Sequence, residues 1–444
     1  MPPQVLVSGP ELRIRLEGGK ESYSPGDTVS GCIYRSRPTP STGTEPTISL
    51  HGQSKSEVTQ SAGYTRKHFV SCCRFFDTRR TTQSLYPGQP LDIQSDSSGA
   101  SWPFAITIPE YMDPKAIAAS DIKQKQSFLP LSPDTVAAQA TPSSFHEPSK
   151  GNKAIEGFVE YYLQAKFQFV TQRKTFFSRQ YKTESHEAIM PLRVEHFSTG
   201  PPMTDFPLKR YTTSKRISSQ RLIPGMEDNR LSLSQKAQRF LGSSKIPRLM
   251  FEIHFDVPTV LQLDNDNPVP LNICLEPIWK STSDIVREAP PNFTVEYLVV
   301  RIKPTTELPM RTQTFTVVRK PMDVITEDRV ASLDTKIQLS LVAEDTGKNP
   351  ETVDIGKLVN FNWSRAAIRK ISTGPNGRKL YPSFITYNIA HRHWLSWELH
   401  GVVAGEKVKL DGTHTVKLLP PSSSKQSTST QLDEAPPPYE KGDN

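Results

Sequence analysis

Apolar and polar residues alternate along several long stretches of this chain. Between residues 159 and 169 every odd-numbered position is apolar, and charged residues such as Glu160 and Lys166 lie between them. The same alternation recurs in four other stretches: 251–257, 337–341, 385–389 and 395–399. Because successive side chains of a strand point to opposite faces, a period of two predicts strands with one buried face.

Turn-forming residues separate these stretches. Five segments rich in Pro, Gly, Asn and Asp have the composition of tight turns: 24–27, 86–88, 266–268, 375–377 and 404–406. Short strands spaced by such turns favour two-layered antiparallel folds. We therefore predict an all-β protein made of two antiparallel immunoglobulin-like β-sandwich domains.

Three stretches without alternation suggest how the chain is divided. Residues 112–150 read as a long inserted loop, residues 197–245 are basic and rich in Ser, and the end of the chain is rich in Ser, Thr, Gln and Pro. A short helix is predicted between Ser232 and Phe240. We predict an N-terminal sandwich (10–196), a basic linker (197–245), a C-terminal sandwich (246–420) and a disordered tail (421–444).

Composition narrows the class of protein. The chain has 444 residues with 39 Pro, and 35% of its residues are hydrophobic, which suits strands and loops better than long helices. It has no run of eighteen apolar residues and no apparent secretory signal, so we expect a cytoplasmic protein. Its four cysteines contain no Cys-x-x-Cys pair, so free thiols are expected and neither a disulfide framework nor a zinc site is indicated.

The net charge of +8 is partly concentrated in the predicted linker. Lys209, Arg210, Lys215 and Arg216 are candidates for contact with anionic lipid headgroups or with acidic cytoplasmic tails of membrane proteins. A purely solvated linker is the alternative. No nucleic-acid-binding motif accompanies these residues, so we expect no nucleic-acid partner.

Ser218 and Ser219 follow Lys215-Arg216-Ile217, a pattern typical of sites for basophilic protein kinases. Phosphate on either candidate serine would cancel local positive charge. An unmodified Ser-rich linker is an equally open alternative.

Signatures of catalysis are missing from the sequence. It contains no Gly-x-Ser-x-Gly, no phosphate-binding loop and no Gly-x-Gly-x-x-Gly. His391 and His393 would share one face of a strand, but two ligands do not make a metal site, so a plain polar strand face is expected. We predict a protein without enzymatic activity, cofactor or metal.

The tail carries the most specific motif. Pro436-Pro437-Pro438-Tyr439 has the Pro-Pro-x-Tyr form of a ligand for WW domains. Consecutive prolines favour a polyproline II helix, whose edge fits an aromatic-lined groove. The alternative is an ordinary Pro-rich solubilising tail.

An ordered series of motifs resembles the fungal α-arrestins. In the first half these are YSPGDTVSG at 23–31, ISLHG at 48–52, WPFAITIP at 102–109, PSSF at 142–145 and YYLQA at 161–165. Ile246-Pro247, PVPL at 268–271, the strand at 293–302 and PSF at 382–384 are similar to the family's C-terminal domain. The insert near 112–141 departs from the family pattern, and no counterpart of the buried polar switch of visual arrestins is assigned.

The resemblance implies an adaptor that works at the plasma membrane or at endosomes. Together with the tail motif, it implies recruitment of a WW-domain HECT-type ubiquitin ligase to transporters or receptors, which promotes their ubiquitination and endocytosis. Two alternatives remain open: an arrestin-fold scaffold for pH or nutrient signalling, and an endosomal sorting subunit without a ubiquitin role.

Overall fold

The computed structural model describes most of the chain in separate stretches. These are residues 4–9, 11–35, 39–41, 44–62, 65–86, 91–93, 100–120, 122, 127–148, 154–174, 179–227, 246–310, 313–325, 330, 333, 336–341, 350–364, 366–367 and 379–423. Strands dominate them and nearly all pair antiparallel, which confirms the all-β prediction. The predicted helix between Ser232 and Phe240 lies outside the described residues.

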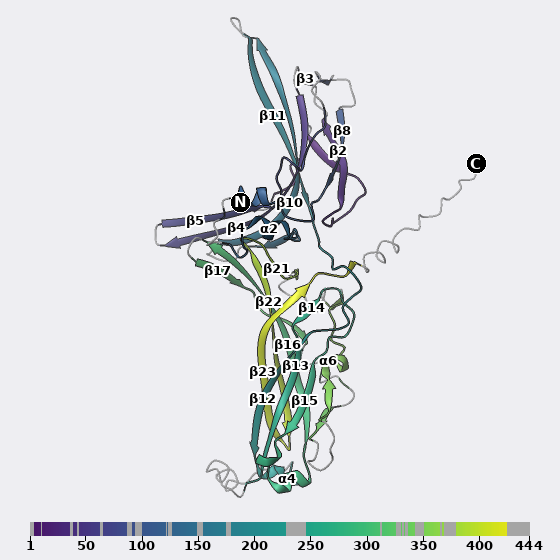
Figure 1. Ribbon diagram of the computed structural model, residues 1–444, viewed down its shortest axis with the longest axis vertical. Helices are drawn as coiled ribbons and strands as arrows, with labels where there is room; N and C mark the ends of the chain where they lie inside the picture. The colour runs from purple at the N-terminus through teal and green to yellow at the C-terminus, as the bar shows by residue number, and fades with distance from the viewer. Residues whose placement is uncertain are drawn as a thin grey trace, which may run out of the picture. The chain divides into compact units, whose positions relative to one another are not determined.

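The chain forms two compact units (Figure 1). Unit 1 comprises Met1–Phe197 together with two later segments, Thr306–Val317 and Phe384–His391. Unit 2 comprises Ser198–Thr305, Val318–Ser383 and Arg392–Asn444. The first unit is therefore not one continuous stretch, whereas the sequence predicted a boundary after residue 196.

Unit 1 contains two main sheets. The smaller has the order β1 (Arg13–Leu16), β2 (Thr28–Arg35), β8 (Ala100–Thr107). The larger has the order β11 (Arg179–Leu192), β10 (Ala154–Lys174), β4 (Thr44–Ala62), β5 (Thr65–Arg74), with β6 (Thr82–Ser84) beside β4 and β9 (Phe145–Glu147) beside β10. A two-stranded sheet joins β3 (Thr39–Ser41) and β7 (Leu91–Ile93).

The predicted strand between residues 159 and 169 is confirmed within β10. Its six odd-numbered side chains, from Val159 to Phe169, are all buried. Glu160, which we expected on the polar face, is also buried. One of its carboxylate oxygens accepts a bond from the Gln53 side chain and the other accepts from the backbone N–H of Gln4, at 2.5 and 2.6 Å.

The first turn of the arrestin-like motif has the expected geometry. Gly26 has φ +90°, which favours glycine, and the Asp27 carboxylate accepts the backbone N–H of Ser24 at 2.9 Å. In β2, a Cβ on Gly31 would lie 2.3 Å from the Arg15 carbonyl oxygen. Glycine at this strand position therefore allows a close approach of the two backbones.

The segment 112–150 is more structured than the loop we predicted. It contains two short helices, α1 (Pro114–Ala118) and α2 (Pro133–Ala137), in addition to β9. Each helix has proline at its start, where a missing N–H is tolerated, and the Asp113 carboxylate caps α1 by accepting the N–H of Lys115 at 2.8 Å. Helices this short lack a full apolar repeat, so alternation could not indicate them.

Unit 2 is built mainly from two sheets. The first has the order β12 (Leu208–Ser218), β13 (Arg248–Pro258), β15 (Asn272–Pro277), β20 (Thr352–Asp354). The second has the order β14 (Val260–Gln262), β23 (Glu406–Leu419), β22 (Ala390–Val403), β16 (Asn292–Met310), and β18 (Met322–Ile325) and β19 (Ile337–Ser340) also pair with β16. The short helices are η2 (Gln220–Leu222), η3 (Trp279–Ser281), α4 (Asp284–Glu288) and α6 (Ile355–Leu358). The late segments of unit 1 contain β17 (Gln313–Val318), apart from Val318, and β21 (Phe384–Ile385).

Both sheets contribute to one hydrophobic cluster in unit 2. The predicted inward residues Phe251, Ile253 and Phe255 of β13 belong to it, as do Leu395 and Trp397 of β22. Burial of these positions confirms the alternation in both stretches.

The predicted linker requires a correction. Residues 208–218 form β12, which pairs with β13 along its whole length (Figure 1). Tyr211 and Ile217 of β12 pack against the hydrophobic cluster. Lys209 and Lys215 share the face of Tyr211 and Ile217, so the strand carries only two apolar side chains on that face and shows no clear alternation.

Candidate functional site

The four predicted basic contact residues lie on β12, but they do not form one patch. Lys209, Arg210 and Arg216 are exposed and Lys215 is half-buried. The pleat of the strand places Lys209 and Lys215 on one face and Arg210 and Arg216 on the other. Arg210 also donates two bonds to the Asp256 carboxylate, at 2.8 and 3.0 Å, which offsets its charge.

The two predicted phosphorylation sites differ sharply in their surroundings. Ser218, the last residue of β12, is half-buried and faces Arg248 of β13 in the strand register. Ser219 is only 1% exposed, and its hydroxyl donates to the Glu406 carboxylate at 2.8 Å. Ser218 and Ser219 are adjacent in sequence but lie in different chemical environments.

The WW-ligand motif, Pro436 to Tyr439, lies outside the described residues. The last described residues before it, 420–423, are bonded within unit 2. The backbone N–H groups of Ser198 and Ser423 donate to the carbonyl oxygens of Pro421 and Ser198, at 2.8 and 3.0 Å. The buried Ser422 hydroxyl donates to the Gly200 carbonyl oxygen, so the order of the chain extends two residues beyond the predicted start of the tail.

His391 and His393 are buried, so the expected polar strand face is wrong at these positions. The Nδ1 atom of His391 lies 3.0 Å from the Thr306 hydroxyl, which in turn donates to the Glu147 carboxylate at 3.2 Å. His393 Nδ1 lies 2.9 Å from the Ser383 hydroxyl, and burial lowers the pKa of His393 to about 3. The described residues contain no group of three or more His, Cys, Asp or Glu side chains that could hold a metal ion.

All four cysteines are free thiols. Burial raises the pKa of Cys72, Cys73 and Cys274, so these three thiols are less readily ionised than an exposed cysteine. Their surroundings therefore do not activate them as nucleophiles.

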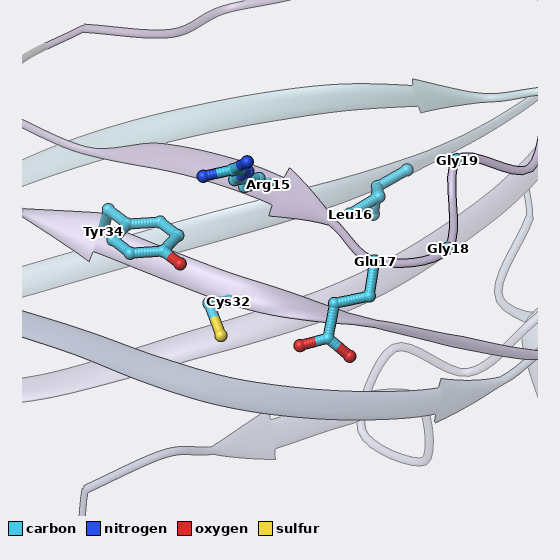
Figure 2. A pocket seen from close by; sticks show the side chains of 7 residues that line it. All are labelled: Arg15, Leu16, Glu17, Gly18, Gly19, Cys32 and Tyr34. Atoms are coloured by element: carbon cyan, nitrogen blue, oxygen red, sulfur yellow. The ribbon is translucent and has the colours of Figure 1, made fainter. Parts of the chain in front are cut away.

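A surface depression of about 430 Å³ lies over β1 and β2 of unit 1 (Figure 2). It is lined by Arg15, Leu16, Glu17, Gly18, Gly19, Cys32 and Tyr34. The lining offers a guanidinium, a carboxylate and a phenol to solvent. These seven residues include the Cys32 thiol but no histidine.

Sequence reasoning missed a buried polar link in unit 1. The side chain of Asn388 donates to the carbonyl oxygens of Ser54 and Ser71, at 3.1 and 3.0 Å, and accepts a bond from the Ser54 hydroxyl. Asn388 and Ser54 have no exposed surface. The only signal in the sequence is a polar residue between the apolar Tyr387 and Ile389, which does not reveal its distant partners.

Comparison with known proteins adds no family assignment. No model of a protein family matches the chain, and a search of curated proteins gives no match. Among the described residues, no helix is both long enough and apolar enough to cross a membrane.

Proposed function

We propose that this chain is a non-catalytic adaptor that recruits a WW-domain HECT-type ubiquitin ligase to plasma-membrane transporters or receptors. Recruitment promotes ubiquitination and endocytosis of these membrane proteins. The proposal assigns the two units to two immunoglobulin-like β-sandwiches of the α-arrestin type. It places the protein in the cytoplasm, peripherally at the plasma membrane or endosomes.

The observation that carries the proposal is the motif Pro436-Pro437-Pro438-Tyr439. Polyproline segments need little further ordering when they dock, so a short motif can recruit a WW domain. Pro436 follows the anchored Ser423 by 13 residues, which span at most about 45 Å when fully extended. A ligase held on this tail would share one scaffold with the cargo, which raises their effective concentration.

The order of the arrestin-like motifs supports the cargo side of the proposal. The all-β architecture agrees with it at a coarse level. The proposed cargo contact is the cytoplasmic tail of a membrane protein. The cations that remain for its acidic groups are Arg216 on one face of β12 and Lys209 and Lys215 on the other. Arg210 contributes less because Asp256 already binds it.

The decisive experiment is capture of a WW-bearing HECT ligase by the full chain and by Tyr439→Ala. We expect Tyr439→Ala to reduce capture at least tenfold, because the tyrosine is one of the three fixed positions of the Pro-Pro-x-Tyr ligand. Lys441→Ala is the matched control in the same tail and should behave like the parent chain. Equal recovery with Tyr439→Ala would contradict the proposal.

A second measurement separates the alternative functions. Turnover of the membrane cargo is followed in cells that carry the parent chain or Tyr439→Ala. Loss of ligase capture together with loss of turnover supports the adaptor. Loss of capture with normal turnover would favour a signalling scaffold or a sorting subunit.

A further inference from the structure

The end of β12 is held against a hairpin turn of unit 2 by a cluster that we call the Ser219 clasp. It consists of Ser219, Arg221, Gly405 and Glu406. The Ser219 hydroxyl donates to Glu406 at 2.8 Å, and the Arg221 guanidinium donates to the Gly405 carbonyl oxygen at 2.9 Å. Arg221 also approaches the Glu406 carboxylate at 4.0 Å.

The turn side of the clasp is rigid. Val403 of β22 pairs directly with Glu406 of β23, which leaves Ala404 and Gly405 as a two-residue turn. Both have positive φ, at +46° and +69°, as a tight primed hairpin turn requires. A Cβ on Gly405 would lie 2.7 Å from the Glu227 carbonyl oxygen, so residues as far as 227 lie against this turn.

The other side of the clasp is a single short turn, and the backbone N–H of Ser219 donates to the Pro247 carbonyl oxygen at 3.1 Å. Ser219 caps the single turn of η2 by accepting the N–H of Arg221, and Leu222 provides the buried apolar anchor of that turn. Release of Ser219 from Glu406 therefore removes a central polar contact of a short segment. Segments with few buried contacts open locally at low cost.

Ser218 has the opposite electrostatic setting. It shares the outer face of the sheet with Arg216 on its own strand and Arg248 directly across on β13. Neither arginine side chain has an ion-pair partner among the described residues. A phosphate on Ser218 would meet two cations, whereas a phosphate on Ser219 would meet the carboxylate of Glu406, which the Arg221 guanidinium at 4.0 Å offsets only in part.

We propose that Ser219 is a cryptic phosphorylation site, and that phosphate on it keeps residues 219–227 detached from the β22–β23 turn. Local opening exposes the hydroxyl to a basophilic kinase that reads Lys215 and Arg216. The Ser219 oxygen attacks the γ-phosphorus of a nucleoside triphosphate, nucleoside diphosphate leaves, and a base of the kinase takes the hydroxyl proton. The resulting phosphomonoester carries between one and two negative charges at neutral pH, and it is much larger than a hydroxyl that is only 1% exposed, so both its size and its charge beside Glu406 oppose closure of the clasp.

Phosphate on Ser218 leaves the clasp closed. Phosphorylation of the two adjacent serines thus has different effects. Phosphate on Ser219 opens the clasp, whereas phosphate on Ser218 is compatible with the closed clasp. The inference is independent of the ligase-adaptor function, because it concerns only contacts within unit 2.

The test is tryptic cleavage of the folded full chain at the Arg221–Leu222 bond, followed by mass spectrometry. We expect Ser219→Glu to be cut about tenfold faster than the parent chain, because the added charge opposes closure. Ser218→Glu is the matched control and should be cut at the parent rate. Ser219→Ala removes the hydroxyl without adding charge and should give an increase of only about two- to threefold.

A rescue variant distinguishes charge repulsion from simple unfolding. Combining Ser219→Glu with Glu406→Gln should slow cleavage at least threefold relative to Ser219→Glu alone. Amide hydrogen exchange in unit 1 should be unchanged in every variant. Cleavage of Ser219→Glu at the parent rate, or equal acceleration in Ser218→Glu, would overturn the proposal.

Direct phosphorylation completes the test. A synthetic peptide of residues 210–227 and the full chain are treated with a basophilic kinase and ATP. We expect the peptide to accept phosphate on both serines, and chains with phosphate on Ser219 to be cut faster than chains with phosphate on Ser218 alone. Failure of the peptide to accept phosphate on Ser219 would overturn the site assignment.

Discussion

The side chain of Asn388 is bonded to Ser54, 334 residues earlier in the chain, through both its amide nitrogen and its carbonyl oxygen. The same amide nitrogen donates to the carbonyl oxygen of Ser71. A late segment of the chain is thereby joined to β4 and β5 within unit 1. Asn388 and Ser54 are fully buried and Ser71 is half-buried, so removal of the Asn388 side chain would leave the Ser54 groups without a partner.

Replacement of Asn388 by Ala should lower the free energy of unfolding by about 2–4 kcal/mol, because it leaves the buried Ser54 groups and the half-buried Ser71 carbonyl oxygen without their partner. Urea denaturation of the full chain measures the change. Gln168→Ala, at an exposed position of β10, is the control and should change stability by less than about 0.5 kcal/mol. A similar small effect for Asn388→Ala would contradict a structural role for this bond.

Residues 1–197 alone should fail to form a stable unit. Phe384 packs edge-on against Phe145 with ring centroids 4.9 Å apart, and Leu308 and Ile389 lie over Gly157. Loss of residues 306–317 and 384–391 would expose this apolar surface. We expect the fragment to bind a hydrophobic dye and to unfold without cooperativity, and coexpression of residues 198–444 to restore solubility. A fragment that unfolds cooperatively on its own would refute this expectation.

Mild acid should destabilise the protein through its buried histidines. Burial lowers the pKa of His51 to about 4 and that of His393 to about 3, both below the ordinary value of 6.5. Between pH 6.5 and these lowered pKa values, the unfolded chain binds protons that the folded chain does not bind. The stability that depends on the two neutral histidines is therefore complete above about pH 6.5 and falls as the pH decreases. Each histidine contributes a slope of up to about 1.4 kcal/mol per pH unit.

Urea denaturation at pH 7.5, 6.0 and 5.0 measures this slope. His393→Gln should show a shallower dependence on pH than the parent chain, even if its stability at pH 7.5 is lower. His68→Gln, at a side chain that is 54% exposed, is the control and should keep the parent slope. An unchanged slope in His393→Gln would show that this histidine does not resist protonation.

Gly412 should be required because a side chain does not fit at this position, and not because the backbone has a conformation that favours glycine. A Cβ at this position would lie 2.1 Å from Cζ2 of Trp397, the residue opposite it in the β22–β23 register. Gly412→Ala should therefore cost about 3 kcal/mol through overpacking, measured by thermal or urea unfolding. Gly18→Ala, at φ +79° with open space around it, should cost only about 1–2 kcal/mol. Equal costs would argue against the steric explanation.

The basic residues of β12 should contribute unequally to any binding of anionic membranes. Arg216 is exposed, whereas Arg210 is already bonded to Asp256. In cosedimentation with vesicles rich in phosphatidylserine, Arg216→Ala should weaken binding about fivefold, the equivalent of about 1 kcal/mol, and Arg210→Ala less than about twofold. Equal losses would indicate a single patch, and binding that is independent of salt would exclude an electrostatic contact.

Local patterns in the sequence were enough to predict the strands and the first turn. The alternation in β10, β13 and β22, and the Pro25-Gly26-Asp27 corner, depend only on residues close in sequence. The same reasoning failed for β12, because its cations obscured the two inward apolar side chains, Tyr211 and Ile217. It also failed for α1 and α2, which are too short to show a helical repeat.

By itself, the sequence determined the all-β class, the turn residues and the Pro-Pro-x-Tyr motif, since each is a property of neighbouring residues. Only the tertiary structure decided which polar residues are buried and what they contact. The bond from Asn388 to Ser54, the burial of His391 and His393, and the difference between Ser218 and Ser219 all arise from partners distant in sequence. No local pattern encodes such partners, because pairing of strands brings them together only when the whole unit folds.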